Sequence, residues 1–415
     1  RGRPARRRRR GSVRRAGKLL RTGHDMSISG RYVIALPAAV AAYAVVVGYA
    51  LPALRRLWLR RRDLAGEPAT VNSAEEWAAL GAARSGTRPG EVGLFAFYSS
   101  VAGAITTTPE LMTLPVDDHA IVRGHAVFDT CTLAAGRMYR LGIHLQRFLQ
   151  SARAARIPLP YGDDDNANVR QMASLIRQTC AASGKRDADV RFWLTAGTGN
   201  LGVTPSGCTT RLYVLVFGGL PGLQPSDGVE GFAEVTVPAS RVPHKPPLLA
   251  ELKSNNYLLN ALTAMTAQDG GGHFGIGVTD AGLVTESCVL NVCAVGADGV
   301  LRTPPFEGIL RGTTVRRVVE LAEAQLAEAH LLAEGHPGRA RLLQGVAQEP
   351  LTTQALYEAR ELFLVAGDTH THPITRLDGR VIGDGKVGPV CRALTAMLEE
   401  DAAADSADQH HPVSA

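Results

Sequence analysis

Strand-like and helix-like apolar segments succeed one another along most of this 415-residue chain without a regular order. Patterns typical of strands occupy 93–99, 125–133, 138–141, 190–195, 212–217, 232–237, 274–279, 287–295, 300–302, 362–365 and 375–382. Apolar residues at helical spacing occupy 144–155, 169–182, 256–268, 314–329 and 390–400. Because strands and helices do not alternate one for one, the sequence predicts a mixed α/β fold with two sheets rather than a doubly wound parallel sheet.

A glycine-rich turn divides these segments into two groups. Residues 218–222 read Gly-Gly-Leu-Pro-Gly, which is typical of a joint between domains. We therefore expect a small N-terminal α/β domain over 93–217 and a larger C-terminal α/β domain over 223–400. Three consecutive aspartates at 163–165 predict a turn or cap before the helix 169–182. The segment 401–415 is expected to be a disordered tail.

The first 92 residues have a different composition. Residues 1–31 form a basic tail, and residues 32–54 contain no charged side chain. A helix of that length, at about 1.5 Å per residue, crosses a hydrocarbon core of about 30 Å, so 32–54 predicts a single transmembrane helix. A cleaved targeting sequence is the alternative, and 55–92 is interpreted as a linker. We expect a membrane-associated protein in an organelle, either a plastid or a mitochondrion.

Charge and cysteine usage exclude two classes of site. The net charge of +6 comes from the N-terminal region, because from Leu64 onward 28 basic residues face 37 acidic ones. A nucleic-acid-binding surface on the folded part is therefore not expected. The six cysteines show no metal-binding or disulfide spacing, which predicts buried thiols and no metal site. His370 and His372 are interpreted as part of a polar loop.

Lys253 is the residue with the clearest chemical signal. The chain has only five lysines, and an arginine cannot replace a lysine in forming an imine because it does not lose its proton. Glu286 and the turn Gly312-Thr313-Thr314 follow Lys253 within about sixty residues. An amine, a carboxylate and a phosphate-binding turn are what pyridoxal 5′-phosphate requires for its aldehyde, its ring nitrogen and its phosphate. The sequence therefore predicts this cofactor.

Seven short blocks in this order resemble the class IV pyridoxal-phosphate aminotransferases, the family of branched-chain and D-amino-acid transaminases and of aminodeoxychorismate lyase. The blocks are Val127-Phe128-Asp129-Thr130, residues 144–152, Lys253-Ser254-Asn255-Asn256-Tyr257, residues 285–291, Thr303-Pro304-Pro305, Gly312-Thr313-Thr314 and Gly385-Lys386-Val387-Gly388. The resemblance covers about 95–398 and implies the two-domain fold-type IV architecture. Residues 117–119 and 123–125 are most similar to the plant-type D-amino-acid transaminases.

The resemblance implies a role for each matching residue. Lys253 would carry the cofactor aldehyde and then move a proton at the substrate Cα, and Glu286 would pair with the ring nitrogen. The other residues implied to bind the cofactor are Arg147, Thr313 and Thr314 at its phosphate, with Tyr257 and Asn291 also at the cofactor. A homodimer is also expected.

The candidate substrate residues are Tyr98, Arg123, His125 and Phe128. Arg123 is assigned to the substrate α-carboxylate, because a guanidinium presents a fork of donors that matches two carboxylate oxygens. An ion pair between Arg123 and Asp117 or Asp118 is the alternative.

These observations predict transamination of a D- or branched-chain amino acid with a 2-oxo acid acceptor. Two alternatives remain open at this stage. One is an aminodeoxychorismate lyase, which would use the same lysine and cofactor to release pyruvate. The other is a catalytically silent, membrane-bound interaction protein on the same fold.

Overall fold

The computed structural model describes residues 73–77, 79, 92–218, 230–332, 342–367, 370–403 and 410–412. These residues belong to one compact unit that begins at Asn72. Within the described ranges, no helix combines the length and apolar run that crossing a membrane requires. The basic tail 1–31, the candidate transmembrane segment 32–54, most of the linker 55–92 and residues 219–222 of the joint lie outside the described residues.

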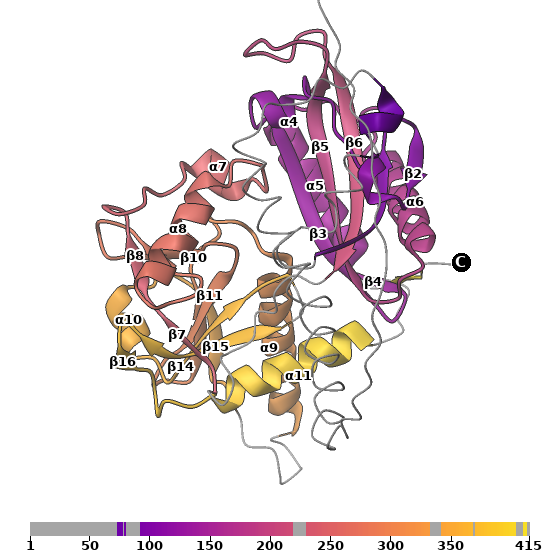
Figure 1. The fold of residues 1–415 in the computed structure, drawn as a ribbon. Helices are drawn as coiled ribbons and strands as arrows, with labels where there is room; N and C mark the ends of the chain where they lie inside the picture. The colour runs from indigo at the N-terminus through magenta and orange to yellow at the C-terminus, as the bar shows by residue number, and fades with distance from the viewer. Residues whose placement is uncertain are drawn as a thin grey trace, which may run out of the picture. The chain divides into compact units, whose positions relative to one another are not determined.

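The strands before the joint form a seven-stranded antiparallel sheet together with β17 from the C-terminal end of the described residues (Figure 1). Its strand order is β17 (His410–Pro412), β4 (Arg137–Tyr139), β3 (Ala126–Ala134), β5 (Ala188–Thr198), β6 (Thr209–Gly218), β1 (Gly93–Ser99) and β2 (Ala104–Thr106). The helices of this part are η2 (Pro109–Leu111), α4 (His119–Val122), α5 (Leu141–Ala154) and α6 (Asp165–Ser183).

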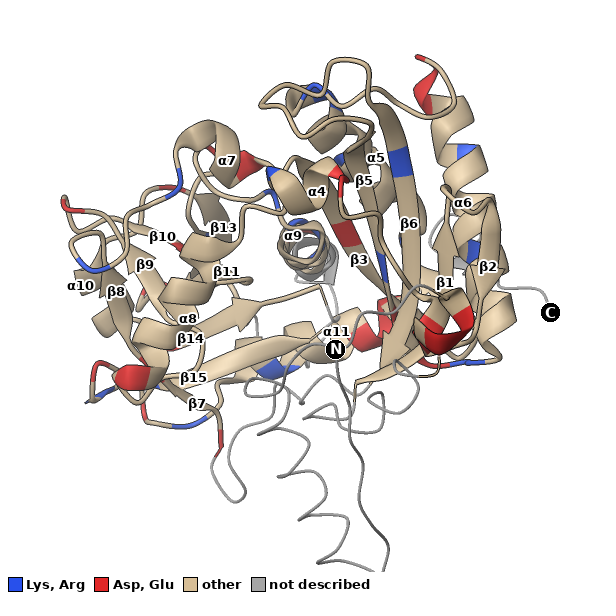
Figure 2. Cartoon of the chain, turned by 45° about the horizontal axis from the view of Figure 1, so that its top comes forward, with Lys and Arg blue, Asp and Glu red and all other residues tan. Residues whose placement is uncertain are grey.

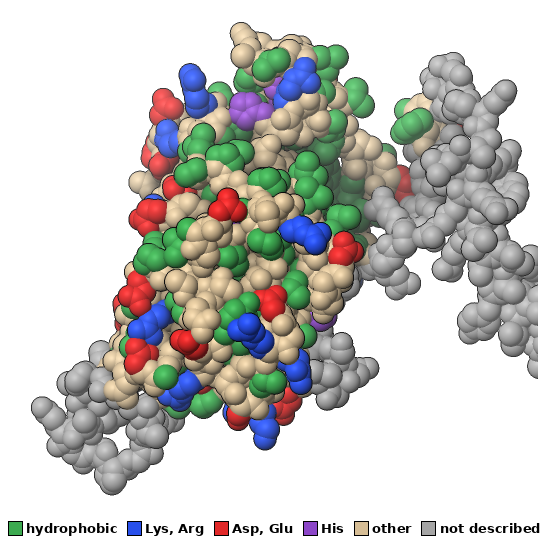
Figure 3. All heavy atoms as spheres, turned by 90° about the vertical axis from the view of Figure 1, so that its left-hand side faces the viewer, with side chains coloured by type: hydrophobic (Ala, Val, Ile, Leu, Met, Phe, Trp, Pro, Cys, Tyr) green, Lys and Arg blue, Asp and Glu red, His purple; other side chains and the backbone are tan. Residues whose placement is uncertain are grey.

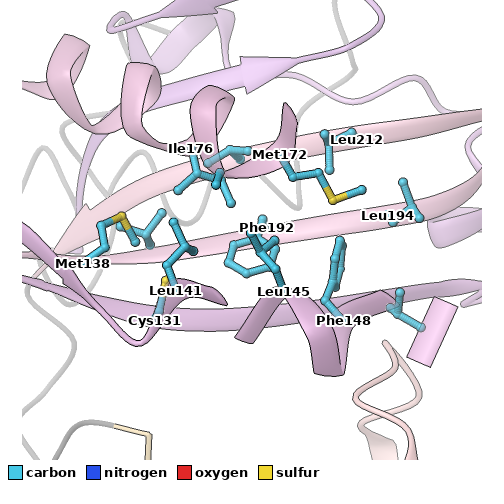
Figure 4. Packing of buried hydrophobic residues seen from close by; sticks show 14 of the residues in the cluster. Cys131, Met138, Leu141, Leu145, Phe148, Met172, Ile176, Phe192, Leu194 and Leu212 are labelled. Atoms are coloured by element: carbon cyan, nitrogen blue, oxygen red, sulfur yellow. The ribbon is translucent and has the colours of Figure 1, made fainter. Parts of the chain in front are cut away.

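Helices α5 and α6 cover one face of this sheet and form its core. Phe148 of α5 and Phe192 of β5 meet edge to face at 4.9 Å between ring centroids. Figure 4 shows these rings beside Met172 and Ile176 of α6. Since successive strand residues point to opposite faces, the neighbours of the core residues on β3 and β5 point away from the helices.

The second part contains two further sheets among the described residues. A mixed sheet has the order β13 (Gly345–Gln348), β12 (Val300–Thr303), β11 (Asn291–Val295), β14 (Glu361–Val365), β15 (Thr371–Leu377) and β16 (Arg380–Val381), with β7 (Phe232–Glu234) parallel to β15. A small sheet joins β10 (Val284–Ser287), β9 (Ile276–Val278) and β8 (Thr236–Pro238). The helices are α7 (Pro247–Glu251), α8 (Leu258–Asp269), α9 (Thr313–Leu332), α10 (Thr353–Tyr357) and α11 (Pro389–Ala403).

Side chains of the central strands of the mixed sheet point alternately to its two faces, and each face packs into its own hydrophobic cluster. Cys293 and Phe363 pack with residues of α9 and α11, whereas Val292 and Leu364 pack into a second cluster on the other face. The mixed α/β fold predicted from the order of segments is confirmed.

The local predictions differ from the structure mainly at element ends. Asp164 accepts a hydrogen bond from Asn166 N–H at 2.9 Å, so the aspartate cluster caps α6 four residues before the predicted helix start. The predicted strand 287–295 is split, because residues 288–290 turn the chain between β10 and β11. His372 lies buried in β15 with its ring 5.9 Å from that of Phe232, so the polar-loop interpretation is wrong for it.

The disordered tail predicted from residue 401 is wrong for the described part of that segment. Residues 401–403 continue α11, and β17 pairs with β4. Asp401 accepts hydrogen bonds from Arg317 of α9 at 2.9 and 2.5 Å and also from the Tyr139 hydroxyl. These charge-assisted bonds connect the end of α11 to α9 and to the first sheet. The composition of this segment, rich in alanine and aspartate, does not predict such contacts.

Candidate active site

A cavity of about 390 Å³ lies where the first sheet meets the start of α9 and the end of β14. Figure 2 looks nearly along α9 and shows strands of both sheets on either side of it. The lining side chains and backbone come from Phe128, Thr130, Thr132, Arg147, Asp189, Arg191, Lys253, Tyr257, Val289, Asn291, Leu310, Gly312, Thr313, Thr314, Val315, Val365, Ala366 and Gly367. Six residues predicted to contact the cofactor, together with Phe128, are therefore brought together.

The main chain at Lys253 pairs with the start of β3. Its carbonyl accepts the Phe128 N–H at 2.8 Å, and the Ala126 carbonyl accepts the Asn255 N–H at 2.9 Å. The Lys253 ammonium lies 5.0 Å from the centroid of the Phe128 ring. Burial, and then the positive charge of Arg147, lower the pKa of the Lys253 amine to about 8. About a tenth of the amine is therefore neutral and nucleophilic at pH 7, far more than for an unperturbed lysine.

Arg147 reaches the cavity from α5 in a fixed orientation. Its Nε and Nη2 donate to the Asp129 carboxylate at 2.9 and 2.7 Å, and His144 Nδ1 donates to the same carboxylate at 2.9 Å. Burial alone would raise the pKa of the Asp129 carboxyl, but Arg147 and His144 outweigh it and hold that pKa well below its usual range. The fully buried aspartate is thus ionised and positions the guanidinium.

The start of α9 forms another wall of the cavity. Thr313 and Thr314 are buried in its first turn, where backbone N–H groups and the dipole of a 20-residue helix favour an anion. A Cβ on Gly312 would lie 2.0 Å from Asn291 Oδ1, so a larger residue would displace the Asn291 side chain. Asn291 Nδ2 also donates to the Leu310 carbonyl at 3.0 Å. Asn291 therefore supports the turn as well as lining the cavity.

Glu286 lies in β10 beside this turn. Its Oε2 accepts the Leu310 N–H at 3.0 Å, and its Oε1 lies 3.1 Å from Lys245 Nζ. Leu310 lines the large cavity, whereas Glu286 and Lys245 line an adjacent cavity of about 50 Å³. Sequence reasoning did not assign Lys245 a place in the site, because its proline-rich surroundings are typical of a loop.

Aromatic rings and a second arginine form the wall on the side of β3 and β5. Tyr257 meets Phe128 edge to face at 5.0 Å between ring centroids, and burial raises the pKa of the Tyr257 hydroxyl above its usual range. The Arg191 guanidinium lies 5.4 Å from the Phe128 ring centroid, and Arg191 Nε donates to Thr130 Oγ1 at 2.9 Å. Sequence reasoning missed Arg191, although a charged residue between the buried Val190 and Phe192 indicates the face of the strand opposite the core.

Three of the four predicted substrate residues do not line this cavity. Tyr98 packs against the core under α5 and α6, because it lies on the opposite face of β1 from Phe97. His125 Nε2 contacts the Ala155 carbonyl at 2.8 Å. Arg123 is exposed and donates to the carbonyls of Val122, Leu201 and Gly202 at 2.7, 2.6 and 3.0 Å.

The alternative ion pair of Arg123 is also not what the structure contains. The Asp118 carboxylate instead accepts Ala120 N–H at 2.8 Å, the Thr195 hydroxyl at 3.0 Å and the Tyr213 hydroxyl at 2.7 Å. Asp118 therefore caps α4 and is satisfied by neutral donors.

The residues present fit pyridoxal phosphate. The amine of Lys253 suits an aldehyde, the start of α9 with Arg147 suits a phosphate, and the Glu286 carboxylate suits a protonated ring nitrogen. Lys253, Arg147 and the start of α9 line the large cavity, and Glu286, which lines the small one, contacts Leu310 of the large one.

Comparisons with known proteins agree with this chemistry. Residues 126–377 match the family described as amino-transferase class IV. The chain is 37% identical over 308 residues to a chloroplastic D-amino-acid transaminase of Arabidopsis thaliana, covering 74% of this chain and 76% of the relative. It is 30% identical over 286 residues to a putative branched-chain-amino-acid aminotransferase of Methanocaldococcus jannaschii, covering 69% and 90%.

Solved structures show the same fold. The crystal structure of a branched-chain amino acid aminotransferase of Escherichia coli superposes with a TM-score of 0.63 at 22% identity, covering 77% of this chain and all of that one. The family resemblance read from the seven sequence blocks is thereby confirmed. The chain belongs to the class IV aminotransferases and is a pyridoxal-phosphate-dependent enzyme.

Proposed function

We propose that this enzyme transfers the amino group of a D- or branched-chain amino acid to a 2-oxo acid. The observation that carries the proposal is the placement of Lys253, Arg147 and the start of α9 around one cavity, with Glu286 beside it. The names of the Arabidopsis and Methanocaldococcus relatives support the two substrate classes.

The chain's own residues divide the work of such a reaction. Bound pyridoxal phosphate would supply a ring that accepts the electron pair left at the substrate Cα. Lys253 Nζ would hold the aldehyde and, when the substrate amine replaces it, move the proton at Cα, since a pKa of about 8 suits a base at neutral pH. Arg147, Thr313 and Thr314 would hold the phosphate, and Glu286 the protonated ring nitrogen.

The substrate would lie against the ring pair Phe128 and Tyr257. Arg191, whose guanidinium faces the same cavity, supplies a positive charge for an anionic substrate. Arg123 lies outside the cavity of its own chain, so its proposed contact with the substrate carboxylate requires that it reach the cavity of a second chain. The exposed Leu201 and Val203 beside it are suited to such a contact.

We propose that the protein is a homodimer, a proposal that this requirement and a second apolar surface support. Leu258, Leu262 and Met265 are exposed on one side of α8. Figure 3, which looks onto the side of the molecule that carries α7 and α8, shows apolar side chains running between scattered acidic and basic ones. A dimer that buries such surfaces would remove apolar area from water.

We further propose that segment 32–54 attaches the enzyme to an organellar membrane. The proposal depends on the uncharged run in the sequence. Retention of the mature full-length protein in membranes after a carbonate wash supports an anchor. A soluble mature protein whose N-terminus maps beyond Leu54 would identify the segment as a cleaved targeting sequence.

A substrate panel tests the proposed reaction. The full-length protein is incubated with D- and L-amino acids, including D-alanine and L-leucine, with 2-oxoglutarate or pyruvate as acceptor. Acceptor-dependent formation of a new amino acid is the expected result. Pyruvate released from aminodeoxychorismate without an acceptor would indicate the lyase instead, and the absence of a borohydride-reducible chromophore would indicate the silent interaction protein.

A further inference from the structure

Lys245 occupies a position at the ring-nitrogen end of the site that the proposed reaction does not use. Its ammonium lies 3.1 Å from Glu286 Oε1, and the two side chains are only 13% and 14% exposed. The same ammonium lies 5.7 Å from the centroid of the Tyr257 ring, which lines the cofactor cavity. This is a largely buried ion pair on the carboxylate that the proposed reaction pairs with the ring nitrogen of the cofactor.

The backbone holds Lys245 in place. It stands between Pro243 and Pro246, and the Pro246 carbonyl accepts the N–H groups of Leu249 and Ala250 at 2.9 Å each. Since proline fixes its own φ and restricts the residue before it, the loop leaves Lys245 few alternative backbone conformations. The contact with Glu286 is therefore a built feature of the site rather than a contact between two mobile surface side chains.

On its far side the pair borders a small cavity whose wall combines apolar side chains with a few polar ones. It has a volume of about 50 Å³ and is lined by His244, Asn260 and Ser287 as well as by the pair. His244 Nε2 and Asn260 Oδ1 are buried there without a protein partner. A cavity of this size with two such polar atoms has room for a water molecule, which can accept a remaining ammonium hydrogen of Lys245 while the contact with Glu286 is kept.

The carboxylate of Glu286 is shared. An ionised carboxylate offers about four acceptor positions, and Leu310 N–H and Lys245 use two of them. A ring N–H can therefore still bind, but it binds a carboxylate whose charge is already partly neutralised. The ring proton also brings a positive charge close to the Lys245 ammonium, and like charges in a largely buried site repel strongly.

We propose that Lys245 is a positioning residue that competes with the cofactor ring for Glu286 and so limits protonation of the ring nitrogen. The inference rests on the proposed pairing of Glu286 with that nitrogen. Lys245 holds the carboxylate in place when the cofactor is absent. When the cofactor is bound, Lys245 weakens the hold of Glu286 on the protonated ring.

The test is cofactor binding to the unloaded full-length protein, without turnover. Two probes are compared: pyridoxamine 5′-phosphate, and its carbocyclic analogue in which a carbon replaces the ring nitrogen. Lys245→Met is expected to bind pyridoxamine 5′-phosphate about fivefold to twentyfold more tightly than the wild type, an order of magnitude set by one like-charge contact in a partly screened site. The same variant should bind the carbocyclic analogue unchanged.

Three further measurements separate competition from a structural role. Lys245→Arg should restore the wild-type affinity, because it keeps the charge. In a Glu286→Gln background, Lys245→Met should have no effect, because the ring nitrogen is then not held in its protonated form. With ¹⁵N-labelled pyridoxamine 5′-phosphate, the ring nitrogen resonance should move toward its protonated position in Lys245→Met.

Unchanged or weaker binding of pyridoxamine 5′-phosphate by Lys245→Met would overturn the inference, as would an equal change for both probes. Lys185→Met, which removes a lysine that contacts the Phe95 ring on the first sheet, is the matched control. If the wild type itself bound both probes equally well and Glu286→Gln changed neither, the proposed pairing of Glu286 with the ring nitrogen would fail instead.

Discussion

Replacing Asp129 by asparagine should both destabilise the protein and loosen the phosphate end of the site. The side chain is fully buried and accepts two hydrogen bonds from Arg147 and one from His144. Asparagine has nearly the same shape, but it leaves the Arg147 guanidinium, which is only 12% exposed, without its counter-charge. Breaking a buried pair by removing one partner costs about 3 to 5 kcal/mol. We take about 3 kcal/mol, because the asparagine oxygen still accepts one bond.

Thermal and chemical denaturation of the unloaded protein measure this loss. At about 2.1 cal/mol/K per residue, unfolding of the unit Asn72–Ala415 has an entropy change of about 0.7 kcal/mol/K, so a loss of about 3 kcal/mol should lower the midpoint by roughly 4 °C. The affinity for pyridoxamine 5′-phosphate should also fall, because Arg147 is no longer fixed. Asp165→Asn is the control, since its pair with Arg153 is about half exposed on both sides and should contribute at most about 1 kcal/mol.

The pH dependence has a definite sign. The pKa of Asp129 is depressed in the folded protein, so its stabilisation is fully present above the unfolded value of about 3.9 and is lost as pH falls through the folded value. The deficit of Asp129→Asn relative to the wild type should therefore be constant at neutral pH and shrink only in strong acid. Equal stability and equal cofactor affinity of variant and wild type at pH 7 would refute this reasoning.

Lys253→Ala should abolish turnover and the borohydride-reducible chromophore, whereas the control Lys185→Ala should retain both. A chromophore that persists in Lys253→Ala at another lysine would contradict the assignment. Glu286→Gln should lower kcat by about a hundredfold or more, because a neutral amide cannot stabilise a protonated ring nitrogen. The change in cofactor affinity should be smaller. Near-wild-type turnover would show that Glu286 has a structural role only. Arg123→Ala should lower kcat/KM by roughly tenfold to a hundredfold if it binds the substrate carboxylate. A lower thermal midpoint with intact kinetics would instead assign Arg123 to the loop carbonyls that it contacts.

What the sequence predicted well depends on short-range patterns. The strand that carries Phe128 and the helix that carries Arg147 follow from apolar spacing, and the cap at Asp164 follows from local hydrogen bonding. The turn at Gly312 was recognisable because a glycine followed by two threonines at a predicted helix start is a local pattern suited to a phosphate.

The features that the sequence did not predict depend on which face of a sheet a side chain points to and on contacts between residues far apart in the chain. Tyr98 and Phe97 differ by one position in a strand, and a shift of one residue exchanges the face that packs against α5 and α6 for the opposite face of the sheet. The partner of Lys245 is Glu286, on another element of the fold, and no local pattern connects them. A lysine among prolines therefore gave no sequence signal for the ion pair that it makes.

Strand β3 links the two ends of the site through its alternation. Phe128 faces the cavity, and its N–H holds the Lys253 carbonyl, while its neighbour Asp129 faces α5 and holds Arg147. Adjacent residues of one internal strand of the antiparallel sheet therefore hold the amine end and the phosphate end of the site. Since a paired central strand moves little, the distance between the two ends is fixed before any ligand arrives. A change at Asp129 should therefore move the guanidinium of Arg147 and leave the amine of Lys253 in place.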